Sequence, residues 1–212
     1  MKTGLVIAFI FGLGLVYVAM NNKKQTNMTF RQKILRTFYP LIMRGSNKKI
    51  INNKGNVHPV EDFYAMSITL NDGSVLDMST LKGKRILIVN VASDCGFTAQ
   101  YEVLEKIYSE NKDRLVVIGF PANDFKNQEK KSDAEIGSFC KKNYGVTFPI
   151  AKKGVVIKAK EQQSVYKWLT DKNLNGWNDQ SPTWNFCKYI IDENGVLIRF
   201  ANSGVTPEAA FQ

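Results

Sequence analysis

Two apolar runs in the middle of the chain have the length and composition of buried strands. Residues 86–91 (ILIVNV) and 115–120 (LVVIGF) are rich in β-branched side chains, which favour strands. Between them, residues 98–111 carry apolar side chains at the three- and four-residue spacing of a helix. The order strand, helix, strand predicts an α/β layer architecture.

The same strand and helix patterns of apolar residues predict further elements. They are a β-hairpin of residues 63–70 and 75–78, a helix at 133–143, a short strand at 155–157, a helix at 162–170, and a second hairpin of residues 186–192 and 196–200. Strands that first alternate with helices and then end in a hairpin favour a thioredoxin-like fold. We therefore expect residues 58–212 to form one domain, with a central mixed sheet flanked by helices.

The front of the chain has a different pattern. Residues 4–20 contain no charge and, apart from Tyr17, are apolar, so residues 1–22 are predicted to be a membrane anchor or signal-anchor. The short segment with Lys2 also fits a cleaved signal peptide. Because residues 17–21 lack a clear small-residue cleavage site, the uncleaved anchor is favoured.

Charge separates this front from the rest of the chain. Ten of the 29 Lys and Arg precede Glu61, the first acidic residue, so the other 19 balance the 19 Asp and Glu. A neutral domain behind a basic front does not suggest nucleic-acid binding. By the positive-inside rule, an uncleaved anchor places the domain in the cytoplasm, whereas cleavage would export it.

Residues 23–57 form a basic segment between anchor and domain. Four apolar residues, Phe30, Ile34, Leu35 and Phe38, share one face of a helix, which predicts a helix lying on an anionic membrane surface. A poorly ordered basic linker is the alternative. Residues 44–57 are polar enough to be a linker in either case.

Cys95 is the residue with the most informative position. It lies where a strand is predicted to end and a helix to begin, and a helix N-terminus favours thiolate over thiol. A small buried core cysteine is the alternative. The single histidine, His58, lies outside the predicted strands and helices, so the domain has no Cys-His pair and no His-rich metal cluster.

Three blocks around Cys95 and beyond it carry a family resemblance. They are residues 90–98 (NVASDCGFT) with Gln100-Tyr101, residues 119–125 (GFPANDF) with Gln128-Glu129, and residues 184–186 (WNF). Together they resemble the glutathione peroxidase family in its cysteine form. The resemblance implies a thioredoxin fold and reduction of hydroperoxides by a Cys, Gln, Trp and Asn tetrad.

Residue by residue, the resemblance makes Cys95 the peroxidatic nucleophile, with Trp184 and Asn185 as donors to the thiolate and the departing oxygen. Asp124 stands where the glutamine is expected. It is then either protonated, or a general base, or turned away with Asn123 in its place. No metal or bound cofactor is implied, since a thiol reductant, thioredoxin or glutathione, is a co-substrate.

Cys140 is the candidate resolving cysteine, since cysteine members of the family often carry one on the helix at 133–143. The expected position is one residue later, at Lys141, and one residue rotates a helical side chain by about 100°. Cys140 is therefore either a resolver that requires unwinding or a core residue. Cys187 is predicted to be a core residue of its strand.

The short stretch between Leu169 and Trp184 resembles family members that are monomers with an open active site. Joined to a membrane anchor, an open site suggests lipid hydroperoxides as substrates. The predicted function is that of a thiol peroxidase that reduces hydrogen peroxide and organic or lipid hydroperoxides. The alternative function is a redox sensor without turnover, which passes the oxidation of Cys95 to a partner protein. A disulfide exchanger is disfavoured because Thr98 occupies the second position of a Cys-x-x-Cys motif.

Overall fold

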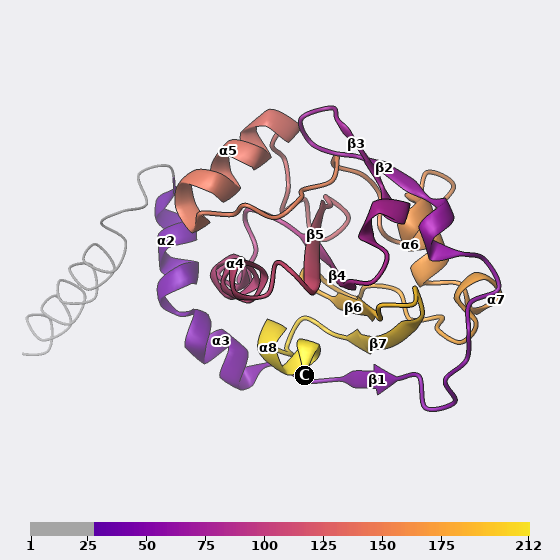
Figure 1. The fold of residues 1–212 in the computed structure, drawn as a ribbon. Coiled ribbons are helices and arrows are strands. Elements are labelled where there is room, and N and C mark those ends of the chain that lie inside the picture. The colour runs from indigo at the N-terminus through magenta and orange to yellow at the C-terminus, as the bar shows by residue number, and fades with distance from the viewer. Residues whose placement is uncertain (1–27) are drawn as a thin grey trace, which may run out of the picture.

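The computed structural model describes residues 28–212 and centres them on a five-stranded mixed sheet (Figure 1). The strand order is β1 (Ile50–Asn52), β7 (Leu197–Ala201), β6 (Lys188–Ile191), β4 (Arg85–Val91) and β5 (Leu115–Pro121). The β4 and β5 strands are parallel, and the other neighbours are antiparallel. A mixed central sheet of this kind is the one expected from the sequence.

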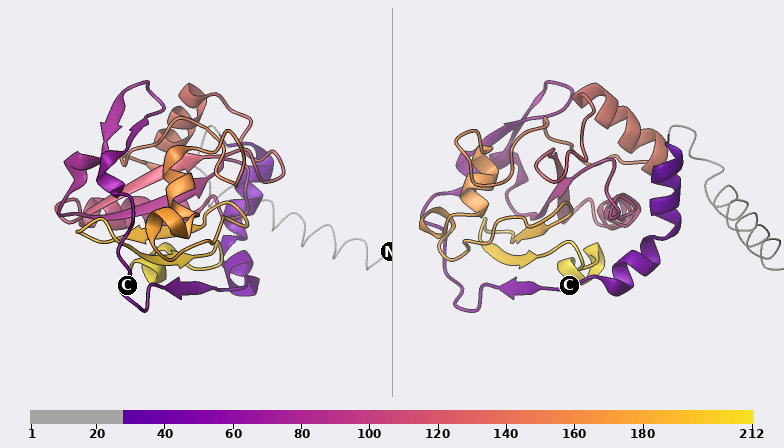
Figure 2. Two further views of the ribbon diagram at one scale, coloured as in Figure 1. Left: turned by 90° about the vertical axis from the view of Figure 1, so that its right-hand side faces the viewer. Right: turned by 180° about the vertical axis from the view of Figure 1, so that it is seen from behind.

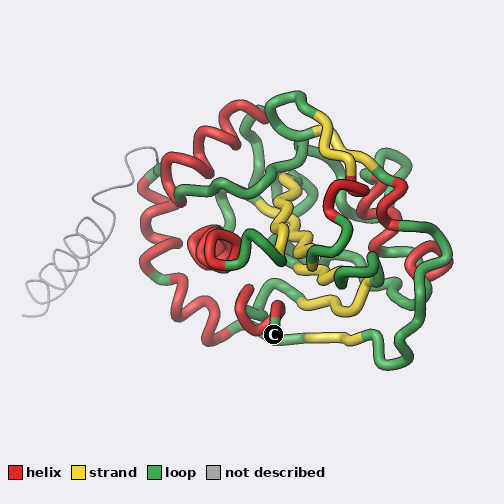
Figure 3. The backbone as a smooth tube through the Cα atoms, in the orientation of Figure 1, coloured by secondary structure: helices red, strands yellow, loops and turns green. Residues whose placement is uncertain are grey.

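Helices cover both faces of the sheet (Figures 2 and 3). The α-helices are α2 (Phe30–Thr37), α3 (Tyr39–Gly45), α4 (Gln100–Glu110), α5 (Asp133–Tyr144), α6 (Ser164–Leu169), α7 (Lys172–Asn175) and α8 (Pro207–Phe211). A separate hairpin pairs β2 (Ser67–Thr69) with β3 (Val75–Asp77), and two 3-10 helices are η1 (Phe63–Ala65) and η2 (Met78–Leu81).

The sheet divides the core into two clusters, as the alternation along β4 illustrates. Ile86 and Ile88 pack toward α6 and the 3-10 helices, whereas Leu87 and Val89 pack toward α4 and α5. Successive strand side chains point to opposite faces, and both faces of β4 are buried. This explains why every residue of 86–91 except Asn90 is apolar.

Most predicted elements are present, but the strand predicted at 155–157 is not. Val155 forms only an isolated bridge to Gln162, and the backbone N–H of Val156 donates to a carboxylate oxygen of Asp124 at 2.8 Å. Val156 is buried in the core. Its apolar character therefore reflects burial and not strand pairing.

The linker predicted at 44–57 is wrong in part, because it contributes an edge strand to the sheet. Residues 50–52 form β1, which pairs antiparallel with β7 in register Ile51 to Phe200. Ile51 also packs against the core. The short apolar pair Ile50-Ile51 is the only local signal, and it is too short to predict a strand without its partner.

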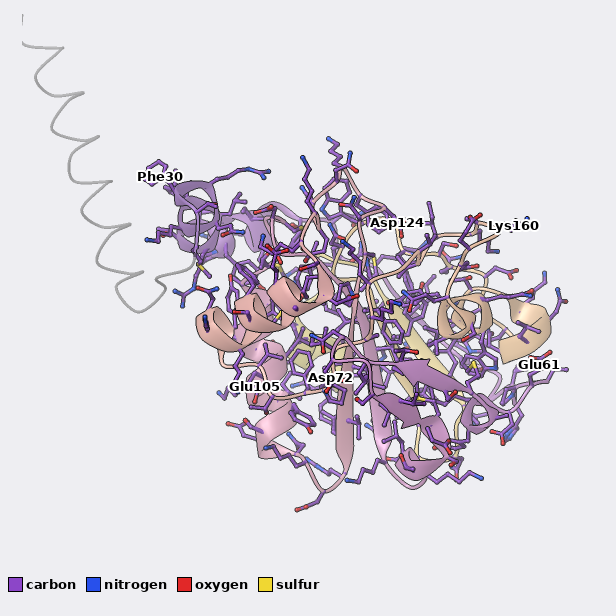
Figure 4. All side chains as sticks on the ribbon, turned by 90° about the horizontal axis from the view of Figure 1, so that it is seen from above. Phe30, Glu61, Asp72, Glu105, Asp124 and Lys160 are labelled. Atoms are coloured by element: carbon purple, nitrogen blue, oxygen red, sulfur yellow. The ribbon has the colours of Figure 1, made fainter. Side chains whose placement is uncertain are left out.

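Residues 28–46, hereafter the arm, contain α2 and α3 and run along the outside of α4 and α5 (Figures 1 and 2). The helix predicted here is present, and Thr29 and Gln32 form a capping box at its start. Phe30 and Phe38 of the predicted apolar face are exposed, whereas the polar residue Gln32 is buried against the domain. Phe30 lies on the outward side of α2 (Figure 4).

The anchor predicted at residues 1–22 lies outside the described residues. Within residues 28–212, no helix is both long and apolar enough to cross a membrane.

Candidate active site

Cys95 lies in the turn that connects β4 to α4. Its backbone N–H donates to the hydroxyl of Thr98 at 3.1 Å, and that hydroxyl donates to the carbonyl of Ala92 at 2.9 Å. The helix α4 begins at Gln100, later than the predicted start at Thr98. The first turn of the helix is therefore separated from Cys95 by a tight turn, which Thr98 closes.

The sulfur of Cys95 is surrounded by hydrogen-bond donors. The backbone N–H of Phe97 donates to it at 3.4 Å, and the Gly96 N–H and the side chains of Trp184 and Asn185 also face it. Cys95 is only 1% exposed, and this burial raises the pKa of the thiol, while the donors oppose the rise. The site thus stabilises negative charge at a sulfur that is shielded from water.

Asp124 does not take part in this arrangement, which corrects its assignment to the glutamine position. Its carboxylate accepts the backbone N–H of Val156 at 2.8 Å. Asn123 does not replace it either, since Asn123 accepts the N–H of Glu129 at 2.9 Å. Both side chains hold the loop after β5 in place, as Asx residues commonly do.

The side chain of Gln128, and not that of Asp124, contacts a residue that faces the Cys95 sulfur. The side-chain N–H of Asn185 donates to Oε1 of Gln128 at 3.0 Å, and the carbonyl of Gln128 accepts the N–H of Asp94 at 3.0 Å. Gln128 therefore contacts both the Asn185 loop and the Cys95 loop. The sequence contained the signal, because Gln128 belongs to one of the three motif blocks.

Glu129 holds the backbone just before Cys95 in place. One carboxylate oxygen accepts both the backbone N–H and the hydroxyl of Ser93, each at 2.8 Å. Burial raises the pKa of Glu129, while the Ser93 bonds oppose the rise. This fully buried residue positions the Cys95 loop without contacting the sulfur.

Asn90 positions the loop that carries Trp184 and Asn185. Its side chain donates to the carbonyl of Trp184 at 2.9 Å and accepts the N–H of Cys187 at 2.9 Å. Between these two contacts, Phe186 adopts a positive φ of 68°. A left-handed conformation at a bulky residue is strained and is found mainly where surrounding contacts impose it.

The comparisons with known proteins agree with this geometry. The glutathione peroxidase family model matches residues 63–170. The chain belongs to the glutathione peroxidase family. It is therefore a peroxidase, and thiol peroxidase chemistry accounts for the donors that surround Cys95.

Two relatives illustrate the similarity of this peroxidase to known proteins. It is 42% identical, over 69% of its length and 90% of the relative, to "Glutathione peroxidase-like peroxiredoxin GPX5" of Chlamydomonas reinhardtii. It is 43% identical to a "Glutathione peroxidase" of Lactococcus lactis, over 66% of its length and 89% of the relative.

Among solved structures, "Trgpx in apo form" has a TM-score of 0.54 and 33% identity, covering 70% of this peroxidase and 90% of that chain. "T. cruzi GPX1" has a TM-score of 0.54 and 28% identity, covering 70% and 91%.

The two other cysteines of the peroxidase lie on opposite faces of the sheet, and all three thiols are free. Cys140 projects from the inner face of α5 into the same cluster as Cys95. Burial raises the pKa of the Cys140 thiol to about 12, while the nearby Tyr101 hydroxyl opposes the rise. Cys187 packs in the other cluster, as expected for a core residue.

Proposed function

We propose that this protein reduces hydrogen peroxide and organic or lipid hydroperoxides through Cys95. The observation that carries the proposal is the convergence of the Phe97 N–H, Trp184 and Asn185 on the Cys95 sulfur. In the reaction, the thiolate attacks one peroxide oxygen and the O–O bond breaks. Cys95 becomes a sulfenic acid, and the other oxygen leaves as water or alcohol after it takes a proton.

The donors act on the charge that moves during this step. Trp184 and the backbone amides favour the thiolate before attack, and they stand where the departing oxygen develops negative charge. Asn185 is oriented by Gln128, to which it donates. Shielding from water strengthens each of these interactions.

For regeneration we propose a thioredoxin-type protein as reductant, with glutathione as the alternative and with no bound cofactor or metal. The relatives named peroxiredoxins favour a protein thiol. Cys140 is the proposed resolver because it shares a core cluster with Cys95. Its thiol attacks the Cys95 sulfenic acid, a disulfide forms and water leaves, after α5 has partly unwound to bring the two cysteines within bonding distance.

The test is a coupled assay of NADPH consumption with the full chain and tert-butyl hydroperoxide. Thioredoxin with its reductase is compared with glutathione and its reductase, for the wild type, Cys140→Ser and the matched core variant Cys187→Ser. We expect turnover with thioredoxin that is lost in Cys140→Ser and kept in Cys187→Ser. Equal turnover in all three proteins would make Cys140 a core residue and Cys95 a one-cysteine catalyst.

A redox sensor without turnover is the second candidate function. It is favoured by the deep burial of both Cys95 and Cys140, which slows exchange with an external reductant. The same assay separates the two functions. Oxidation of Cys95 seen by mass, without NADPH consumption with either reductant, would support the sensor and reject the peroxidase proposal.

We also propose that the peroxidase is a monomer held at a membrane, with residues 1–22 as anchor and the domain on the cytoplasmic side. Cleavage of that segment would instead export the domain. The arm supports membrane contact, because Phe30 is 59% exposed and Leu41 is 62% exposed. Exposed basic side chains such as Arg31 and Arg44 accompany them, as in helices that lie on anionic lipid.

A further inference from the structure

The arm contacts the backbone just before Cys95 through Gln32. This side chain is only 5% exposed, and its amide N–H groups donate to the carbonyl of Ser93 at 3.2 Å and to Oδ1 of Asp94 at 2.6 Å. Its Oε1 accepts the N–H of Thr29 at 2.8 Å. Every polar atom of the Gln32 amide is thus engaged, and both donated bonds go to the Cys95 loop.

The arm also contacts the backbone just after Cys95. A Cβ placed on Gly96 would lie 3.3 Å from Cδ1 of Ile42 and 4.0 Å from Cδ2 of Leu35. The inner side of the arm therefore lies against Gly96 so closely that a larger residue there would meet it. Gln32 on one flank and these two apolar side chains on the other enclose the loop that carries Cys95.

Several contacts that do not involve the loop seat the arm on the domain. Arg36 forms an ion pair with Glu102 on α4, and its guanidinium lies 6.0 Å from the ring centroid of Tyr144 on α5. Directly after the arm, the backbone carbonyl of Asn47 accepts a hydrogen bond from the side chain of Asn202 at 3.1 Å. The arm lies outside residues 63–170, the part of the chain that the family model matches.

We propose that the arm is a component of the active site and that Gln32 is a positioning residue for Cys95. By holding Ser93 and Asp94, Gln32 keeps the loop in the conformation in which the sulfur meets the Phe97 N–H, Trp184 and Asn185. Displacement of a reacting group by about 1 Å can lower a rate by up to a hundredfold. The inference rests on the proposed role of Cys95 as peroxidatic nucleophile.

The experiment measures two properties of Cys95 in the full chain. One is the rate of its single-turnover oxidation by hydrogen peroxide, and the other is the pH midpoint of its alkylation, both followed on the Cys95 peptide by mass. Gln32→Met keeps the volume but removes both donated bonds. We expect oxidation to slow by about tenfold and the alkylation midpoint to move to higher pH, because the sulfur loses aligned donors.

A second variant covers the case in which Gln32→Met does not fold. In Gln32→Glu, the carboxylate faces the Ser93 carbonyl and Asp94, and repulsion displaces the loop. Protonation of the new carboxyl group restores one donor. The rate of Cys95 oxidation in Gln32→Glu, relative to the wild type, should therefore recover as the pH falls. The exposed arm residue Arg31 provides the matched control, and Arg31→Ala should retain the wild-type rate and midpoint.

Two outcomes distinguish the positioning role from the function on which it rests. If the wild type reacts with peroxide and both Gln32 variants match its rate and midpoint, the positioning role is rejected. If the wild type does not react but the alkylation midpoint of Gln32→Met is raised, Gln32 positions Cys95 and the proposed peroxidatic role is rejected.

Discussion

Asn185 donates its side-chain amide to Oε1 of Gln128 at 3.0 Å, and this bond joins the two loops that surround the Cys95 sulfur. It also fixes which end of the Asn185 amide faces the site, because the nitrogen that donates to Gln128 carries a second N–H for the sulfur. Gln128 therefore acts on Cys95 at least partly through Asn185.

The first prediction separates Gln128 from Asp124. Gln128→Met should lower the rate of Cys95 oxidation by about ten- to a hundredfold, less than the hundred- to thousandfold typical for direct loss of a donor to the reacting atoms, because Gln128 orients the donor Asn185. Asp124→Asn should change it by less than about twofold, since Asn still accepts the Val156 N–H. Stopped-flow oxidation with hydrogen peroxide provides both rates. A severe defect in Asp124→Asn alone would return Asp124 to the catalytic site.

The second prediction concerns the pKa of Cys95, which burial raises above that of an ordinary thiol. Trp184 and Asn185 lower it by stabilising the thiolate, so Trp184→Phe and Asn185→Leu should each raise it further. The pH midpoint of alkylation should move upward in both variants. Trp177→Phe is the matched control, because the Trp177 ring N–H donates to the Leu197 carbonyl. Unchanged midpoints in both site variants would argue against donors at the sulfur.

A third prediction follows from Lys188, which is fully buried and donates to the carbonyl of Val205. Burial lowers its pKa to about 7, whereas a lysine in the unfolded chain has a pKa of about 10.4. The unfolded state thus binds more protons between these values, and the stability contribution of Lys188 decreases as the pH falls through this window.

Lys188→Met removes this titration, so the variant should gain stability relative to the wild type at low pH. The difference in free energy of unfolding between the variant and the wild type should decrease by about 2 kcal/mol between pH 7 and pH 9. Urea unfolding of both proteins at pH 6, 7, 8 and 9 measures the difference. If the difference in free energy of unfolding does not vary with pH, Lys188 is not the titrating group.

The fourth prediction concerns the start of the domain. A chain that begins at residue 58 lacks β1 and the arm, whereas one that begins at residue 28 keeps both. Loss of the buried Met28 and Met43 and of the pairing of β1 with β7 should lower the free energy of unfolding by about 3 kcal/mol or more. The chain from 58 should also react more slowly at Cys95. Equal stability and rate would show that the arm is dispensable.

The fifth prediction tests membrane contact by the arm, using the chain from residue 28. This chain should float with vesicles containing anionic lipid and less with neutral vesicles, and added salt should weaken binding. Replacing the exposed apolar residues of the arm, Phe30, Phe38 and Leu41, by Ser should abolish flotation. The same changes at Val60 and Val75, which are exposed elsewhere, should leave it intact. Flotation that persists without the three arm residues would locate the membrane contact elsewhere.

Local pattern was sufficient for the central elements of the fold. The strand at 86–91 is buried on both faces, so its apolar run is interrupted only by Asn90 and is easily recognised. The helix at 133–143 has a complete start signal, because Ser132 and Glu135 form a capping box. Cys95 was placed correctly at the end of β4 for the same reason, since its position follows from the strand before it.

Other features were not predicted because local pattern misrepresents them. Apolar spacing assigned Phe30 and Phe38 to a side that faces a membrane surface, but nothing local indicated that Gln32 would face the domain. Asp124 was chosen by its place in a motif, although its carboxylate has a backbone partner at Val156. In both cases the partner that decides the side chain's role is distant in the sequence.

The sequence by itself determined the paired strands other than β1, the main helices of the domain, the position of Cys95 and the family, because each depends on neighbouring residues and their spacing. Only the tertiary structure decided that Gln128 completes the site and that the arm encloses the Cys95 loop. Gln128 and Asn185 are separated by 57 residues, and Gln32 and Asp94 by 62. Such contacts arise from the packing of loops and helices around the sheet, and no periodicity within either segment encodes them.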